Sequence, residues 1–233
     1  MNKYQKYLPT KSNILVLAPH PDDEVIGCGG TLLLHKNLGS IINCVYLNRS
    51  EQSRFLTGIP LEERVKIREA EAAKVAQELG VSNTHFLCDL NFKIKDDLLK
   101  NSLAVFINKK YRPDIIFIPW YGDDHPEHVL INQYLSEIKL DMDLLKSTLV
   151  IGYEVWTPIF RPNIFSNITD VLQIKLSLLK MYHSVGGDSY YSEAIKGMNR
   201  FRSLYVYGGV GYSEAFMEMS LRDYIVAIKK SFH

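Results

Sequence analysis

The chain alternates between short apolar runs and amphipathic helices, and this order restricts the folds open to it. Five segments are predicted as strands: residues 14–18, 41–47, 84–87, 115–119 and 149–153. Most of them are nearly continuous in apolar residues, which is typical of strands buried on both faces. Helices between such strands favour parallel pairing through right-handed crossovers. We therefore expect an α/β fold with a Rossmann-like, doubly wound, mainly parallel sheet and helices on both faces.

The clearest predicted helix covers residues 61–79. It follows Pro60, carries Glu62 and Glu63 in its first turn, and is ended by Gly80. A glycine-rich turn at 27–30 is expected to lead into the first helix. The other predicted helices cover residues 31–37, 96–110, 126–138 and 171–182, the last with Asp170 as its N-cap. No linker or repeat interrupts the pattern, so a single domain over 1–233 is expected, with residues 190–212 left unassigned.

Composition excludes several classes of function. The 27 basic and 26 acidic residues give a net charge of +1, which leaves no basic excess for a nucleic-acid backbone. No apolar stretch is long enough to cross a membrane, and the polar N-terminus lacks a signal-peptide core. The three cysteines form no paired motif, so reduced thiols are expected. A cytoplasmic protein is the resulting expectation.

Two clusters of histidine and carboxylate residues directly follow predicted strands. Pro19-His20-Pro21-Asp22-Asp23-Glu24 comes after the strand at 14–18, and Asp123-Asp124-His125-Pro126-Glu127-His128 comes after the strand at 115–119. Open α/β sheets place their active sites at the carboxyl ends of the strands. The two clusters are therefore predicted to be the two halves of one site.

The residue types in these clusters suit a catalytic metal. His20 and Asp23 are three residues apart across a proline-containing turn, and His128 can supply a third ligand. Two histidines and one carboxylate with an open position form a catalytic zinc arrangement. Zn²⁺ is therefore the predicted cofactor, with Fe²⁺ or Co²⁺ as alternatives because such a site selects weakly among these ions.

Hydrolysis at such a metal also needs groups that are not ligands. Asp22 is the candidate general base, since its side chain diverges from that of Asp23. His125 is the candidate donor to an oxyanion, with its ring oriented by Glu127 or Asp124. Acidic residues also occur at helix starts because they favour the helix dipole. The presence of two such clusters at strand ends favours the functional interpretation.

In these motifs the chain resembles the LmbE-like, or PIG-L, family of zinc-dependent N-deacetylases. The helix from Arg64 to Gly80-Val81 and the segment Tyr212-Ser213-Glu214-Ala215-Phe216 also resemble segments of that family. The resemblance implies that His20, Asp23 and His128 are zinc ligands, that Asp22 is the general base and that His125 stabilises the oxyanion. It also implies a Rossmann-like fold and the removal of an N-acetyl group from N-acetylglucosamine-type conjugates.

The chain departs from the family pattern at two places. Glu127 stands where the family has an aspartate between the two later histidines, which retains the charge on a longer side chain. Cys88-Asp89 stands where many members have an Asp-Gly that contacts sugar hydroxyls. We therefore do not expect this chain to make the sugar contacts that those family members make after the third predicted strand.

A small-molecule amino-sugar conjugate is the predicted partner, and a homo-oligomer is left open. The aromatic residues expected to stack on a sugar ring are Trp120, Tyr121 and Trp156. Arginines that would hold an anionic substituent are Arg49, Arg54 and Arg161, and Arg68 is a further candidate on the long helix. The alternatives are the same metal chemistry on another amide or ester, and a non-catalytic sugar-binding relative.

Overall fold

The computed structural model describes residues 4–50, 52–87, 96–186 and 191–231. Within these ranges one sheet has the strand order β1-β7-β8-β6-β5-β2-β3-β4. The strands are β1 (Gln5–Lys6), β2 (Asn13–Ala18), β3 (Ile41–Tyr46), β4 (Val81–Phe86), β5 (Ile115–Pro119), β6 (Leu149–Tyr153), β7 (Ile164–Asn167) and β8 (Ser213–Ser220). Strand β8 runs antiparallel to β6 and β7, and the other neighbouring pairs are parallel. The predicted mainly parallel sheet is confirmed.

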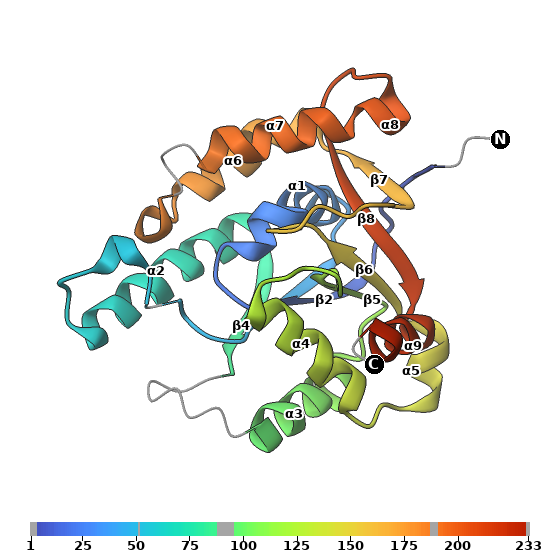
Figure 1. Ribbon diagram of the computed structural model, residues 1–233, viewed down its shortest axis with the longest axis horizontal. Helices are drawn as coiled ribbons and strands as arrows, with labels where there is room; N and C mark the ends of the chain where they lie inside the picture. The colour runs from blue at the N-terminus through green and yellow to red at the C-terminus, as the bar shows by residue number, and fades with distance from the viewer. Residues whose placement is uncertain (1–3, 51, 88–95, 187–190, 232–233) are drawn as a thin grey trace.

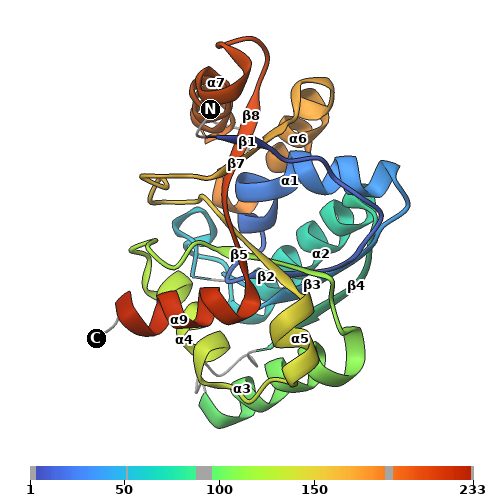
Figure 2. The same cartoon turned by 90° about the vertical axis from the view of Figure 1, so that its right-hand side faces the viewer.

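Helices cover both faces of the sheet (Figures 1 and 2). One face packs against α1 (Asp23–Asn37), α2 (Leu61–Leu79) and α6 (Leu172–Lys180), and α7 (Ser192–Arg202) lies beside α6 and contacts β8. The other face packs against α3 (Asp96–Val105), α4 (Pro126–Glu137), α5 (Met142–Ser147) and α9 (Leu221–Ser231). Along β2, Ile14 and Val16 belong to the first core, and Leu15 and Leu17 to the second. This alternation explains the continuous apolar sequence, because both faces of the strand are buried.

The strand order reverses at β2. The chain leaves β2 to form β3 and β4 on one side, and later forms β5 and β6 on the other side. The carboxyl ends of β2 and β5 therefore flank the topological switch point, where open α/β sheets bind ligands. The two histidine and carboxylate clusters begin directly after these two strands.

Several element bounds differ from the prediction. The predicted bounds of 61–79, 115–119 and 149–153 agree with α2, β5 and β6, whereas β4 covers Val81–Phe86 in place of 84–87. The unassigned segment contains α7 and α8 (Leu204–Tyr207). Asp170 lies inside the 3-10 turn Thr169–Val171 and caps no helix, because that turn precedes α6. None of the described helices is long and apolar enough to cross a membrane.

The glycines at 27–30 lie inside α1 and do not form the predicted turn. A Cβ added at Gly27 would lie 2.1 Å from Cδ2 of Tyr153 in β6, and one at Gly30 would lie 2.6 Å from Cγ2 of Ile168. The missing side chains therefore let α1 lie close to β6 and to the segment after β7. A sequence signal for a turn was in fact a signal for close packing of a helix on a sheet.

We expect Gly27→Ala to destabilise the protein, because the new methyl group overlaps the Tyr153 ring and overpacking costs about 1–3 kcal/mol. Urea unfolding measures the change in the free energy of unfolding. Gly197→Ala is the matched control, since that helical glycine has no heavy atom within 4 Å of an added Cβ. The control should be neutral or stabilising. Equal effects of the two substitutions would contradict the packing role of Gly27.

Candidate active site

A cleft of about 670 Å³ opens at the carboxyl ends of β2, β3 and β5. The first motif contributes His20, Asp22 and Asp23 to its wall, and the second contributes His125 and Glu127. The remaining wall is formed by Asn48, Ser50, residues 52–55, Trp156, Val185 and Tyr191. The structure therefore brings the two motifs together, although they are about a hundred residues apart in the chain.

The first motif turns sharply at Asp22, just before α1 begins. Asp22 has a φ of +134°, an unusual backbone conformation for a residue with a side chain. Its backbone N–H donates to Oε2 of Glu24 at 3.0 Å, and the Tyr182 hydroxyl donates to the other oxygen of Glu24. Such backbone strain persists when surrounding contacts fix it, and it is concentrated at functional sites. The turn places both Asp22 and Asp23 in the wall of the cleft, with Asp23 against His20 and His128.

Three of the predicted site residues converge on one carboxylate oxygen. Oδ2 of Asp23 lies 3.1 Å from Nδ1 of His20 and 3.2 Å from Nε2 of His128. Donors at about 2.0–2.2 Å from a tetrahedral zinc lie roughly 3.3–3.6 Å from one another, close to these separations. His128 is fully buried, and neither of its ring nitrogens has a hydrogen-bond partner within the described residues. A buried ring nitrogen that faces a carboxylate without forming a hydrogen bond to it fits a metal ligand, so this donor set fits a zinc ion.

The charges of this cluster also favour a cation. Burial would raise the pKa of Asp23, but His128 and His20 lower this pKa well below its usual range. Burial lowers the pKa of His20, but Asp23 and Glu127 raise it more, to about 10. Without a metal, the carboxylates therefore hold protons on the histidines. A bound divalent cation would replace those protons as the source of positive charge.

His125 lies beside the two candidate ligand histidines. Its ring centroid is 5.0 Å from that of His20 and 4.8 Å from that of His128. Burial and the charges of His20 and His128 lower the pKa of His125, which favours the neutral ring. Nδ1 of His125 accepts the backbone N–H of Glu127 at 3.4 Å, so the neutral ring carries its hydrogen on Nε2. His125 can therefore donate a hydrogen bond into the cleft. One of its ring nitrogens also lies within 4.8 Å of donor atoms of His20 and His128.

Asp22 lies in the turn of the first motif, directly before the ligand candidate Asp23, and lines the cleft. Burial and the neighbouring charge of Asp23 raise the pKa of Asp22 to about 7, although Arg68 and His20 oppose the shift. A carboxyl group with a pKa near neutrality can both accept and return a proton. This property suits the predicted general base.

Asp123 is a residue of the second cluster to which the sequence analysis gave no separate role in the site. It is buried, and its Oδ1 lies 3.4 Å from Nδ1 of His128 and accepts the backbone N–H of His125 at 3.0 Å. Its Oδ2 accepts the N–H groups of Trp156 and Thr157. A carboxylate behind a ligating histidine orients the ring and raises its basicity. The signal for Asp123 was its place at the strand end, five residues before His128.

Glu127 does not support His125 as predicted. Its Oε2 contacts Nε2 of His20, and its Oε1 accepts a hydrogen bond from Asn48 at 2.5 Å. Asp124 accepts the Thr157 hydroxyl at 2.7 Å. The longer glutamate side chain starts in the first turn of α4 and crosses the cleft to the first motif. Sequence reasoning missed Asn48, because a single amide after a strand carries no distinctive pattern.

Two of the predicted substrate contacts line the cleft. Arg54 lies in a short 3-10 turn (Arg54–Leu56), and Trp156 stacks on His125 with ring centroids 6.3 Å apart. The indole of Trp156 is 53% exposed, which leaves surface for a ligand. Tyr191, from the segment that the sequence left unassigned, packs edge-on against Trp156 at 5.9 Å.

The other predicted contacts lie elsewhere. Nε of Arg49 donates to Glu69, and the guanidinium of Arg161 lies over the Phe160 ring on the surface. Trp120 donates to the carbonyl of Thr157, and Tyr121 packs on Tyr224. Arg68 is fully buried behind the first motif. Residues 88–94, which include the Cys88-Asp89 departure from the family pattern, lie outside the described residues.

Comparison with known proteins agrees with the geometry of the cleft. The family model described as PIG-L: GlcNAc-PI de-N-acetylase matches residues 15–139, which include both motifs. The chain belongs to the PIG-L family. A curated relative, the diacetylchitobiose deacetylase of Thermococcus kodakarensis, is 30% identical over 192 residues, 73% of this chain and 69% of the relative. The predicted family membership is therefore confirmed.

Solved structures confirm the fold of this PIG-L family protein. The N,N'-diacetylchitobiose deacetylase of Pyrococcus horikoshii has a TM-score of 0.76 at 23% identity, over 91% of this chain and 86% of the other. The 4-carboxy-2-hydroxymuconate hydratase GalB of Pseudomonas putida has a TM-score of 0.72 at 20% identity, over 88% and 95%. The same fold therefore occurs in a hydratase, so the fold does not by itself fix the reaction.

We expect His128→Ala to remove most of the metal, and Asp123→Asn to weaken zinc affinity roughly 10–100-fold through the loss of the carboxylate behind His128. Chelator competition measures the affinity, and elemental analysis measures the metal content. Asp124→Asn is the matched control, because this neighbouring aspartate contacts Thr157 instead of the site. Unchanged affinity in a folded Asp123→Asn protein would show that His128 is held without it.

Proposed function

We propose that the protein is a zinc-dependent hydrolase that removes the N-acetyl group from an N-acetylglucosamine-type amino-sugar conjugate. One observation supports this most: donors of His20 and His128 meet at the Asp23 carboxylate, with Asp22 and His125 beside them, in a member of the PIG-L family. In this proposal His20, Asp23 and His128 hold the metal. Hydrolysis adds water to the amide and yields acetate and the free amine.

The residues of the cleft have separate roles in the proposed hydrolysis. Bound zinc would make a coordinated water more acidic and would polarise the amide carbonyl. The Asp22 carboxylate accepts the proton of the attacking water and returns it to the amine nitrogen as the C–N bond breaks. Its strained backbone, held by Glu24, keeps it beside the ligands. His125 donates from Nε2 to the carbonyl oxygen as negative charge develops there.

The substrate is held by the wall of the cleft. The exposed indole of Trp156 adjoins His125 and offers an apolar face to the sugar ring. Ser50 also lines the cleft and can provide a hydroxyl group for the ring hydroxyls. Of the four predicted arginines, Arg54 is the one in the cleft, so an anionic substituent would be held by one guanidinium and not by a cluster.

Asp22→Asn should retain zinc and lose about two or more orders of magnitude in the rate of acetate release, because the proton acceptor is removed. The assay measures acetate from N-acetylglucosamine and N,N'-diacetylchitobiose, with chelator-treated enzyme as the blank. Asp124→Asn serves again as the control with unchanged turnover. Near-normal turnover in zinc-loaded Asp22→Asn would assign the base to another group. Release from esters or other amides, with none from these sugars, would favour the same chemistry on another substrate.

His125→Ala should lower kcat by about 10²–10³-fold without loss of zinc, as expected when an oxyanion donor is removed. His125→Gln should restore part of the rate, because its amide N–H₂ can still donate. Zinc content distinguishes this role from direct ligation, since a nitrogen of His125 lies close to those of His20 and His128. Loss of the metal in both variants would make His125 a ligand.

A further inference from the structure

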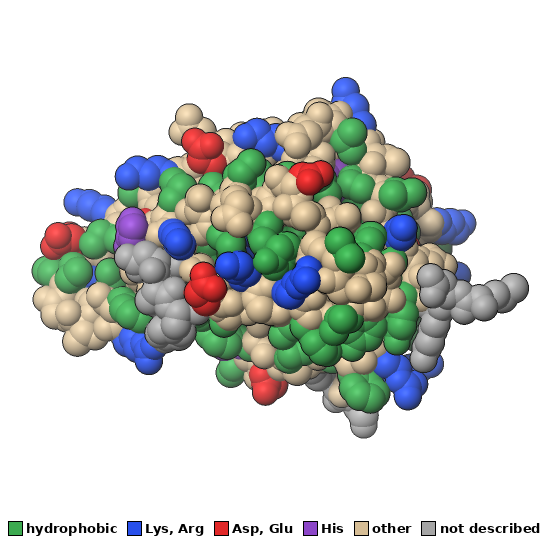
Figure 3. Space-filling view, turned by 90° about the horizontal axis from the view of Figure 1, so that it is seen from above, with side chains coloured by type: hydrophobic (Ala, Val, Ile, Leu, Met, Phe, Trp, Pro, Cys, Tyr) green, Lys and Arg blue, Asp and Glu red, His purple; other side chains and the backbone are tan. Residues whose placement is uncertain are grey.

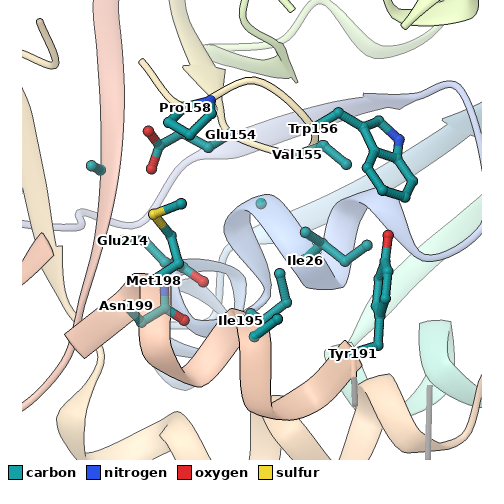
Figure 4. Close-up of a pocket in the computed structure, with 13 residues that line it drawn as sticks. Ile26, Glu154, Val155, Trp156, Pro158, Tyr191, Ile195, Met198, Asn199 and Glu214 are labelled. Carbon is teal, nitrogen blue, oxygen red and sulfur yellow. The ribbon is translucent and has the colours of Figure 1, made fainter. Parts of the chain in front are cut away.

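A second pocket of about 190 Å³ adjoins the cleft (Figure 4). Its walls are the first turns of α1, the segment after β6 and the inner face of α7, and β8 forms one end. Trp156 and Tyr191 line both cavities, and their rings lie at one end of the second pocket. The two cavities are therefore adjacent and share these two rings.

The middle of this pocket is apolar. Ile26 projects from α1, Val155 follows β6, and Ile195 and Met198 project from α7 (Figure 4). Val155 and Ile195 pack against the core on one side, and both of them and Met198 remain partly exposed. Uncovered apolar surface inside a concavity is typical of a ligand site.

The polar groups at the other end are already paired within the protein. Glu154 forms an ion pair with Arg202 and accepts the backbone N–H of Ile159. Asn199 accepts from Nζ of Lys175 at 3.0 Å and donates to the carbonyl of Ser213 at 3.2 Å. A ligand that replaced these partners would leave a buried charge uncompensated. The pocket therefore suits a group that needs no hydrogen bonds.

Glu214 at the same end is the most extensively paired of these groups. It accepts the backbone N–H groups of Gly30 and Thr31, each at 2.8 Å, and pairs with Lys175 at 2.7 Å. Lys175 also donates to the carbonyl of Ile26 at 2.8 Å. These contacts fix α1 against β8 and α6, so this end of the pocket is preformed.

We propose that this pocket binds a short hydrocarbon substituent of the substrate while the amide that is hydrolysed lies in the cleft, an inference that rests on the proposed function. The volume is below the roughly 300–1,000 Å³ of sites that hold a whole ligand, so it suits one substituent and not a second sugar. The chain can belong either to the aglycone or to the acyl group of the amide. Both sources share the same chemistry, and the substrates below distinguish them.

The first experiment compares four substrates in two pairs with the zinc-loaded enzyme: the methyl and n-hexyl glycosides of N-acetylglucosamine, and N-acetylglucosamine with N-hexanoylglucosamine. Burial of several methylene groups should lower KM roughly tenfold for one of the two hexyl compounds relative to its short-chain counterpart. A gain for the glycoside assigns the pocket to the aglycone, and a gain for the amide assigns it to the acyl group. No gain for either overturns the proposal.

A variant that fills the pocket makes the test specific. Met198→Trp should remove the gain of the hexyl compound and leave the KM and kcat of the methyl glycoside within about twofold. Glu193→Trp is the matched control on the same helix, because the Glu193 side chain is 72% exposed. If Met198→Trp lowers the thermal stability, Ile195→Phe replaces it. Equal losses for the hexyl and methyl substrates in the folded variant overturn the proposal.

A binding measurement separates this proposal from the deacetylase function. n-Hexyl β-glucoside has no amide to hydrolyse, so calorimetry with this compound and its methyl counterpart tests the pocket directly. Tighter binding of the hexyl compound that is lost in Met198→Trp supports the pocket even if no acetamido sugar is hydrolysed. Acetate release without any preference for the hexyl group retains the function and overturns the pocket.

Discussion

The shared contact of His20 and His128 with one oxygen of Asp23 is the interaction on which the site depends. It joins the segment after β2 to the helix after β5, and all three side chains are largely removed from water. A buried carboxylate is stable only beside compensating positive charge or donors. The histidines supply that charge when protonated, and a metal would supply it in the proposed enzyme. Glu127 contacts His20 and Asp123 lies beside His128, so each histidine has a carboxylate on both sides.

Arg68 holds the surroundings of this cluster together. Its guanidinium donates to the carbonyls of Pro21 and Arg49 and to the Ser184 hydroxyl at 2.8 Å, and it pairs with Glu71. One buried side chain therefore joins α2 to three segments around the cleft. Helix α2, which supported the family resemblance, therefore stabilises the segments around the cleft through Arg68 and Glu71. The Arg68 side chain is fully buried and does not line the cleft.

The two cavities differ in the chemistry that they offer. The larger cleft presents ionisable groups of both signs, whereas the smaller pocket has its acidic groups paired with Lys175 and Arg202 and leaves its apolar groups uncovered. The ring pair of Trp156 and Tyr191 belongs to both. A substrate with a polar reacting part and an apolar substituent fits this division.

The amino-acid sequence by itself determined the five strands β2 to β6, their parallel pairing and the two clusters that meet at the site. Apolar runs such as 115–119 and the span of α2 depend on local periodicity and helix ends, which a sequence displays directly. His20, Asp22, Asp23, His125 and His128 were predicted as site residues because they follow strands whose carboxyl ends share one edge of the sheet.

Only the tertiary structure decided which neighbours each of these residues has. The glycines of α1 were interpreted as a turn, because their close approach to Tyr153 and Ile168 involves residues more than a hundred positions away. The sequence predicted four arginines as substrate contacts and could not distinguish among them. Of these four, only Arg54 lines the cleft, whereas Arg49 contacts Glu69, Arg68 contacts Pro21 and Arg161 contacts Phe160. The direction of a long side chain is set by its partners in space, and a linear pattern does not record them.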